Sequence, residues 1–264
     1  MDDYWFKQSI NKPLFSDLMW SKPENKTHAG KLLIIGGSTN GFAHTVGCYS
    51  KANSAGAGVV KVLIPVSTKK LIGQASEDIV YGAATKSGGF SQAALAEFID
   101  TASWSDAVLL SGELGNNSET TILFEKFLEE YSGSLVIAGD AFDFSNSFWD
   151  VLLKSHAVTF VLDIAKLQKL SISAGLTKPI TSNISLVNLI EILHEMTELN
   201  SANLVIEYAG FIIIASQGYV STTNLENKNN TQIKLAANAA VWYMQNKNKV
   251  FEALSCAAIT CQVE

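Results

Sequence analysis

The sequence predicts an α/β protein: a three-layer αβα sandwich with a mostly parallel central sheet and some antiparallel edge. Two observations lead to this prediction. Short apolar runs of strand length alternate with longer segments of helical periodicity along most of the chain. Late in the chain, two apolar runs instead follow one another across Tyr208-Ala209-Gly210, as they do in an antiparallel hairpin.

The best-defined unit lies at residues 31–65. Residues 32–35 form a compact apolar run that ends at Gly36-Gly37, which predicts a buried strand. Residues 43–55 are small and mostly apolar, which favours a helix packed closely on a sheet, and glycines separate them from a second strand at residues 59–64. A strand–helix–strand connection of this kind is right-handed and makes its two strands parallel.

The remaining elements follow in order from the same criteria. Residues 91–102 are amphipathic, and residues 119–131 place Ile122, Leu123, Phe127 and Leu128 on an inward face. Asp163 is in position to cap the helix that follows it. Further strands are predicted at residues 78–81, 107–110, 135–138, 158–162, 204–206, 211–215 and 219–221, and further helices at residues 16–19, 67–74, 149–153, 164–170, 186–199, 231–245 and 251–260.

Composition narrows the class of protein. The chain has 264 residues, of which 47% are hydrophobic and 17% charged, so we expect one domain over residues 1–264 with residues 1–30 as a lead-in. A net charge of −6 without a Lys/Arg cluster argues against a nucleic-acid surface. No apolar span has membrane-crossing length, and the acidic start does not resemble a signal peptide, so we expect no membrane association and a cytoplasmic location.

The cysteines and histidines predict no metal site. Cys48, Cys256 and Cys261 lack metal-ligand spacing, and their odd number and apolar neighbours favour reduced, buried thiols. The histidines at positions 28, 156 and 194 show no pattern typical of a triad or a metal centre.

Several candidate binding residues lie at the predicted carboxyl ends of strands, the edge where open α/β sheets bind ligands. Gly36, Gly37 and Ser38 follow the first strand of the 31–65 unit, and backbone N–H groups of such a turn can face an anion. Gly115 either lines the same pocket or serves turn geometry alone. Asp140 ends another strand and either meets a ligand hydroxyl or hydrated cation, or caps the next turn.

Three segments together resemble the ADP- or ATP-dependent NAD(P)H-hydrate dehydratases, a family with the ribokinase-like fold. The family's opening strand, GGS turn and AGAG-like turn stand here as residues 34–38 and 55–58. Its GPGLG turn stands as Ser111-Gly112-Glu113-Leu114-Gly115, with Glu113 at the central glycine. Its DADAL segment stands as residues 138–142, where Asp140 matches the second aspartate and the first is lost.

The resemblance implies site residues and also departures from them. His44 stands where the family has a small alanine, so its ring either contacts ligand or narrows the pocket. Asp163 stands where the family has a histidine, and we expect it to cap a helix. Lys166 stands where the family has a glutamate, and Glu207 where it has a lysine. We expect both of these to be neutral surface substitutions. The family's GSGD-type turn before the long C-terminal helix, with its catalytic aspartate, is missing, because residues 219–245 contain no glycine or aspartate. Thr231 is a helix cap there.

By resemblance, the chemistry is phosphorylation of hydrated NADH or NADPH by ATP or ADP with Mg²⁺, followed by loss of phosphate. Because the turn that supports such transfer is missing, we expect a divergent homologue with weak or no catalysis. The resemblance implies ATP or ADP with Mg²⁺ as cofactors, and a homologue without catalysis has no need of them. Three alternatives stay open: an active dehydratase whose base is Asp140 or Asp163, a non-catalytic nucleotide-binding or structural protein, and another small-molecule kinase of the same fold. The expected partners are the NAD(P)H hydrate and an adenine nucleotide; homo-oligomer formation is left open.

Overall fold

The computed structural model describes residues 3–23, 25–73, 76–176, 178–226, 229 and 231–263. Its ten strands are β1 (Trp5–Gln8), β2 (Lys31–Gly36), β3 (Val59–Pro65), β4 (Ile79–Gly82), β5 (Ala107–Gly112), β6 (Leu135–Ile137), β7 (Val158–Asp163), β8 (Asn203–Tyr208), β9 (Phe211–Ser216) and β10 (Tyr219–Asn224). Its α-helices are α1 (Ser16–Trp20), α2 (Ala43–Ser54), α3 (Lys69–Ile72), α4 (Leu95–Trp104), α5 (Ser118–Glu130), α6 (Ala141–Phe144), α7 (Trp149–Leu152), α8 (Ile164–Ser173), α9 (Leu186–Leu199), α10 (Thr231–Gln245) and α11 (Val250–Val263).

All ten strands form one sheet in the order β1-β10-β9-β8-β7-β6-β5-β2-β3-β4. The strands from β8 through β7, β6, β5, β2 and β3 to β4 are parallel, whereas β9 is antiparallel to both β8 and β10. The predicted mostly parallel sheet with an antiparallel edge is therefore confirmed. The switch to antiparallel pairing follows from the short turn at Ala209 and Gly210, which have φ angles of 50° and 81°.

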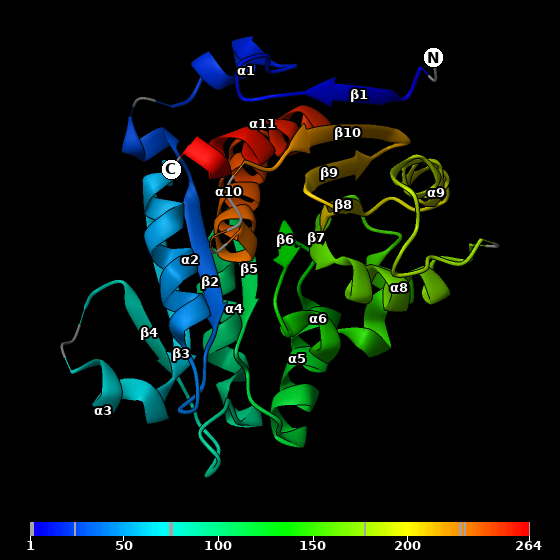
Figure 1. Ribbon diagram of the computed structural model, residues 1–264. Helices are drawn as coiled ribbons and strands as arrows, with labels where there is room; N and C mark the ends of the chain where they lie inside the picture. The colour runs from blue at the N-terminus through cyan, green and yellow to red at the C-terminus, as the bar shows by residue number, and fades with distance from the viewer. Residues whose placement is uncertain are drawn as a thin grey trace.

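Helices cover both faces of the sheet, as Figure 1 shows. Alternate residues of β2 point to opposite faces: Leu32 and Ile34 belong to the core beneath α2, α10 and α11, and Leu33 and Ile35 to the core beneath α4, α5 and α9. The close contact of α2 with α10 depends on Gly47, where an added Cβ would lie 3.0 Å from Ile233 Cγ2. The predicted αβα sandwich is confirmed.

Three features differ from the sequence-based expectation. Residues 5–8 form β1, parallel to β10, in a segment for which no strand was predicted. The short helix α6 was not predicted either. Ile122 was expected to face inward with Leu123 and Phe127, but it is 38% exposed, so that prediction was wrong; Thr120 and Phe124 are buried on the inward face instead. The last residue of the helix predicted at 67–74 lies outside the described residues.

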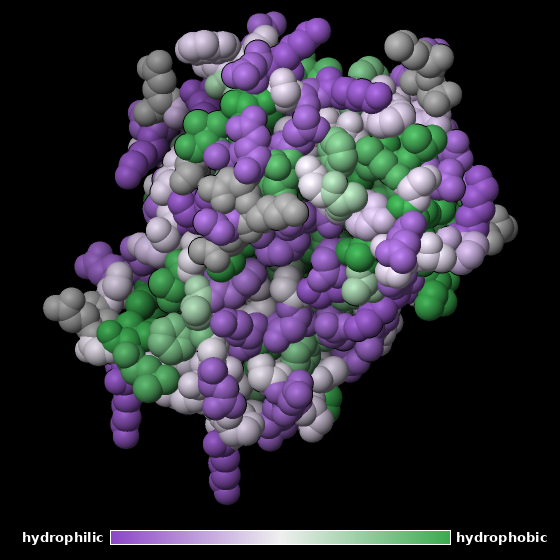
Figure 2. All heavy atoms as spheres, in the orientation of Figure 1, coloured by the Kyte–Doolittle hydropathy of each residue, from purple (hydrophilic) through white to green (hydrophobic). Residues whose placement is uncertain are grey.

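The surface is mixed in polarity. In Figure 2 apolar side chains gather at the lower left, over α3 and β4, where Val66 and Leu71 are 45% and 55% exposed. The three cysteines are buried and form no disulfide with one another, as predicted. Among the described residues, no helix has the length and apolar character needed to cross a membrane.

Candidate functional site

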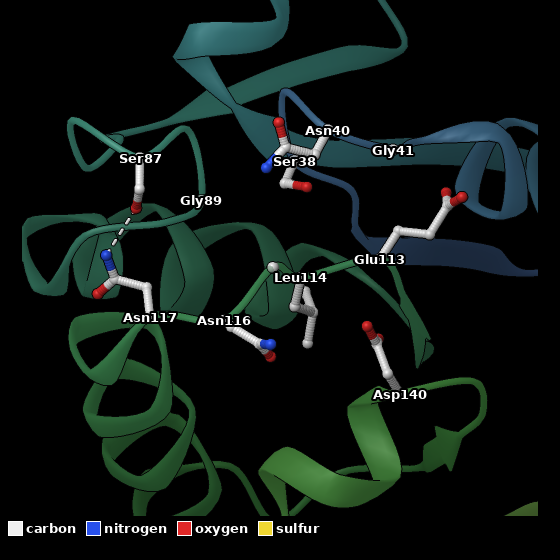
Figure 3. A pocket seen from close by; sticks show the side chains of 11 residues that line it. Ser38, Asn40, Gly41, Ser87, Gly89, Glu113, Leu114, Asn116, Asn117 and Asp140 are labelled. Carbon is white, nitrogen blue, oxygen red and sulfur yellow. Dashed lines mark hydrogen bonds between the residues drawn. The ribbon is translucent and has the colours of Figure 1, made fainter.

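A polar cleft of about 510 Å³ opens at the carboxyl ends of β2, β5 and β6 (Figure 3). Parallel strands end at one edge of the sheet, and this cleft lies at that edge. Residues from four stretches of chain, near positions 40, 88, 114 and 140, form its wall. They are Ser38, Asn40, Gly41, Ser87, Gly89, Glu113, Leu114, Gly115, Asn116, Asn117 and Asp140.

The loop after β2 is held by backbone hydrogen bonds. Ser38 N–H donates to Gly41 O at 2.8 Å, and Gly41 N–H donates to Ser38 O at 3.2 Å. Thr39 N–H donates to Gly88 O at 3.1 Å, which joins this loop to the one that carries Ser87. On the opposite side, Asn117 Nδ2 donates to Ser87 Oγ at 2.7 Å (Figure 3). The cleft wall is thus a connected set of loops.

Gly36 lies beneath the cleft, at the end of β2. An added Cβ there would meet Ser111 Oγ, Thr45 Oγ1 at 2.6 Å and Gly112 O at 2.7 Å. Thr45 Oγ1 and Ser111 Oγ hydrogen-bond each other at 2.9 Å in this buried space. Gly36 is therefore required for close packing of β2 against β5 and α2, and it does not line the cleft.

Glu113 holds an unusual backbone conformation. Its φ is 58°, between Gly112 at 106° and Gly115 at 76°, so a glutamate occupies a left-handed position that favours glycine and costs about 1–2 kcal/mol. Its Oε2 accepts a hydrogen bond from His44 N–H at 2.8 Å, in the first turn of α2. Phe42, the residue before α2, provides no side-chain cap. Glu113 therefore caps α2 from a distant loop and places a carboxylate at its positive end.

Asp140 follows β6 and contributes the second carboxylate of the cleft. Its Oδ1 is buried and has no hydrogen-bond partner among the described residues. Burial raises the pKa of this carboxyl, and the negative charge of Glu113 adds to that rise; hydrogen bonds from the backbone N–H groups of Leu114 and Glu113 and the charge of His44 oppose it. Asp140 thus brings a carboxylate to the cleft wall that backbone N–H groups hold in place and that no cationic side chain of the lining pairs with.

His44 does not line the cleft, although its backbone binds Glu113. Its Nδ1 lies 3.6 Å from Cys48 Sγ. Burial lowers the pKa of the imidazole, Asp140 opposes this effect and Lys166 adds to it, so the neutral ring is favoured. The imidazole ring is therefore a neutral group next to Cys48, outside the cleft lining, while the backbone of the same residue binds Glu113.

The other predicted residues lie at the same edge of the sheet but outside the cleft. Asp163 caps α8, as predicted, because its Oδ1 accepts from Lys166 N–H at 2.8 Å. Its Oδ2 is 3.5 Å from Lys166 Nζ. Glu207 accepts from Gln232 Nε2 at 3.2 Å, close to the start of α10. Thr231 begins α10 and is buried. Residues 227, 228 and 230, which precede α10 where the family has its GSGD-type turn, lie outside the described residues.

Of the predicted site residues, Ser38, Gly115 and Asp140 line the cleft, and Gly36, Gly37, His44 and Asp163 do not. The amides of Asn40, Asn116 and Asn117 and the hydroxyl of Ser87 were missed. Asn116 and Asn117 directly follow the 111–115 turn, so extending that motif would have found them. Ser87 lies on a loop that reaches the cleft only through tertiary contacts, so no local sequence pattern indicates it.

The cleft does not fit a nucleotide phosphate or its magnesium ion. None of the residues that line it is lysine or arginine, and Glu113 already binds an N–H of α2 that an anion would use. Nor do three His, Cys, Asp or Glu side chains come together in metal-binding geometry anywhere in the described part of the chain. With two carboxylates and no cationic side chain among its lining residues, the cleft favours neutral or cationic hydrogen-bond donors instead.

The raised pKa of Asp140 gives a testable pH dependence. The pKa of Asp140 in the native state is above the ordinary value of 3.8. Between these two pKa values the native state holds a proton that the unfolded chain has released. The free energy of unfolding therefore falls as pH rises from 3.8 through the native pKa. We expect Asp140→Asn to match the wild type near pH 3.8 and to become the more stable protein as pH rises. Urea denaturation of both proteins at a series of pH values measures this difference. Asp143→Asn, which removes an exposed pair with Lys169, is the control and should show no such gain.

The fold resembles several solved structures at low sequence identity. A ribokinase-like superfamily protein from Enterococcus faecalis V583 matches with a TM-score of 0.74 and 16% identity, over 100% of this chain and 88% of that one. An ADP/ATP-dependent NAD(P)H-hydrate dehydratase from Bacillus subtilis, co-crystallised with ATP/Mg²⁺, matches with a TM-score of 0.63 and 13% identity, over 95% and 87% of the two chains. A pyrophosphate-dependent kinase of the ribokinase family, complexed with myo-inositol and a pyrophosphate analogue, matches with a TM-score of 0.57 and 13% identity, over 88% and 94%.

These similarities confirm the ribokinase-like fold, which serves kinases and a dehydratase alike. No protein-family model matches the sequence, and no curated protein matches it either. At such identities the fold is shared, and function has to be argued from the cleft.

Proposed function

We propose that this chain is a divergent relative of the nucleotide-dependent NAD(P)H-hydrate dehydratases that binds a small polar molecule in the Asp140 cleft and has little or no dehydratase activity. One observation carries the proposal: a formed polar cleft is lined by the Asp140 carboxylate and by no lysine or arginine, while Glu113 occupies the neighbouring helix N-terminus. Binding of a donor group is thereby favoured and binding of a transferred phosphate is not.

The sequence before α10 supports the same conclusion. Phosphoryl transfer depends on positioning and on donors that stabilise charge on the phosphate. Residues 219–245 contain neither glycine nor aspartate, so this chain offers no Gly-Asp turn at the start of α10. Removal of one well-placed donor typically costs about 10²–10³ in rate, and here both a turn and a carboxylate are lacking.

Turnover of hydrated NADPH with ATP or ADP and Mg²⁺ tests the catalytic half of the proposal. Recovery of NADPH absorbance and release of phosphate should both be at least about 10²–10³-fold slower than for the Bacillus subtilis enzyme assayed in parallel. Rates within tenfold of that enzyme would contradict the proposal.

An active dehydratase with Asp140 as its base is the second candidate. It is favoured by the raised pKa of Asp140, since a base works best with a pKa nearer to the operating pH. If turnover is fast and Asp140→Asn abolishes it while Asp143→Asn does not, this candidate replaces the first.

Ligand-dependent stability tests the binding half. A ligand at 100 times its Kd should raise the free energy of unfolding by about 2.7 kcal/mol. We expect polar small molecules to raise the melting midpoint, and Asp140→Ala to remove that shift. Millimolar AMP, ADP, ATP and NADPH with Mg²⁺ belong in the same series, and a shift with one of them that survives Asp140→Ala would point to a nucleotide site outside the cleft.

A further inference from the structure

The charge of the cleft distinguishes between classes of ligand. Its two ionisable side chains are Glu113 and Asp140, and the remaining polar side chains are the amides of Asn40, Asn116 and Asn117 and the hydroxyls of Ser38 and Ser87. Such a lining can bind hydroxyl groups in either direction, because amides and hydroxyls both donate and accept. It offers an anionic ligand no opposite charge, and a cationic ligand two.

Glu113 makes the start of α2 unavailable to an external anion. The free N–H groups in the first turn of a helix can form a site for phosphate or carboxylate. Here His44 N–H donates to Glu113 Oε2 at 2.8 Å, and Gly41, which lines the cleft just before α2, would place a Cβ 3.2 Å from Glu113 Oε1. The protein's own carboxylate therefore stands where a phosphate would bind, and it would repel one.

Asp140 offers the complementary feature. Figure 3 shows its carboxylate pointing into the space between Glu113 and Leu114, and none of the residues that line the cleft is lysine or arginine. A carboxylate with no cationic side chain beside it in the cleft binds an N⁺–H group more strongly than a neutral O–H group. An ammonium group at this position also reduces the repulsion between Asp140 and Glu113.

We propose that the cleft binds a small hydroxylated molecule that carries an ammonium group, of the amino-sugar class, with the ammonium paired with the Asp140 carboxylate, and that Glu113 excludes phosphorylated ligands from the N-terminus of α2. The inference rests on the proposed function, because it uses the same cleft. It adds the charge of the ligand and the residue that selects it.

Three matched hexoses test the charge preference. D-Glucosamine, D-glucose and D-glucose 6-phosphate are titrated into the protein at slightly acidic pH, and binding is followed by ligand-observed NMR and by the melting midpoint. D-Glucosamine should bind at least about tenfold more tightly than D-glucose, as for a charge-assisted hydrogen bond compared with a neutral one, and the phosphate ester most weakly. Tightest binding of the phosphate ester, or no binding of D-glucosamine, would overturn the proposal.

Variants of Asp140 separate recognition of the ammonium from general attraction of cations. Asp140→Asn should reduce D-glucosamine binding to the level of D-glucose, while Asp143→Asn, which alters an exposed carboxylate on α6 three residues away, should leave the ratio unchanged. A ratio that survives Asp140→Asn would overturn the assignment.

Replacement of Glu113 tests the exclusion of phosphate directly. Glu113→Gly removes the carboxylate and suits the φ of 58°, so the variant is expected to fold. It should bind inorganic pyrophosphate at least about tenfold more tightly than the wild type, because the first turn of α2 becomes free. Unchanged pyrophosphate binding in a folded Glu113→Gly protein, checked by circular dichroism, would refute the role of Glu113. Fast hydrate turnover would instead refute the proposed function and leave these binding ratios to be judged separately.

Discussion

Replacing Gly36 by alanine is expected to lower the free energy of unfolding by about 3 kcal/mol, the upper part of the range for overpacked interiors. The added Cβ would overlap Ser111 Oγ and lie 2.6 Å from Thr45 Oγ1 and 2.7 Å from Gly112 O. Gly112 O accepts the hydrogen bond of Gly37 N–H at 2.8 Å, so relief of the overlap requires β2 and β5 to separate below the cleft. At about 2–4 °C per kcal/mol, the melting midpoint should fall by roughly 6–12 °C.

Gly56→Ala is the matched control for Gly36→Ala. Gly56 has a φ of 95° and no atom within 4 Å of an added Cβ, so this variant carries backbone strain without overlap. It should cost about 1–2 kcal/mol. Urea denaturation of both variants measures the difference, and an equal cost for the two would show that packing at Gly36 is looser than these distances imply.

Replacing Phe98 by alanine should cost about 3–5 kcal/mol, because the site is a closed aromatic cluster. Phe98 is fully buried, and its ring meets those of Phe90 at 4.9 Å and of Phe124 and Phe127 at 5.5 Å, all edge-on. Phe90 directly follows the loop that carries Ser87 and Gly89 to the cleft, and Phe90 O accepts from Thr120 Oγ1 at 2.8 Å. The variant should therefore also weaken ligand binding in the cleft.

Ile122→Ala on α5 is the control for Phe98→Ala. Ile122 is 38% exposed and outside the buried core, so its truncation should cost less than about 1 kcal/mol. Thermal and urea unfolding measure stability, and ligand titration at a temperature where both variants are folded measures the cleft. A loss below 2 kcal/mol for Phe98→Ala would mean that the cluster collapses into the vacated space.

The central strands could be predicted from sequence because each is a contiguous apolar run, and strands buried on both faces need no alternation. β1 could not be predicted in this way. Residues 5–8 are only partly apolar, and they become a strand because β10, more than two hundred residues later, supplies their partner. Ile122 was misplaced because helical spacing shows which residues share one side of the helix, but it does not show which of them lie at the boundary between the sheet and solvent.

The candidate site could be predicted in part for a similar reason. Ser38, Gly115 and Asp140 lie in the loops that follow predicted strands, so the topology places them at one edge. The role of Glu113 depends on a left-handed backbone and on a hydrogen bond to His44, and neither is encoded in the few residues around it. Ser87 reaches the cleft through its partner Asn117, a contact that only the folded chain provides.

The pairing of β1 with β10 has a consequence for synthesis of the protein. Trp5 lies opposite Val220, so β1 finds its partner strand only after Tyr219–Asn224 has been made. Until then residues 5–8 lack their partner strand, although the strands from β2 to β9 have already been made. Gln8 Nε2 then donates to Thr223 Oγ1 and Ser255 O, both at 2.8 Å, and ties β1 to β10 and α11. Completion of this sheet edge therefore waits for the synthesis of β10 and α11.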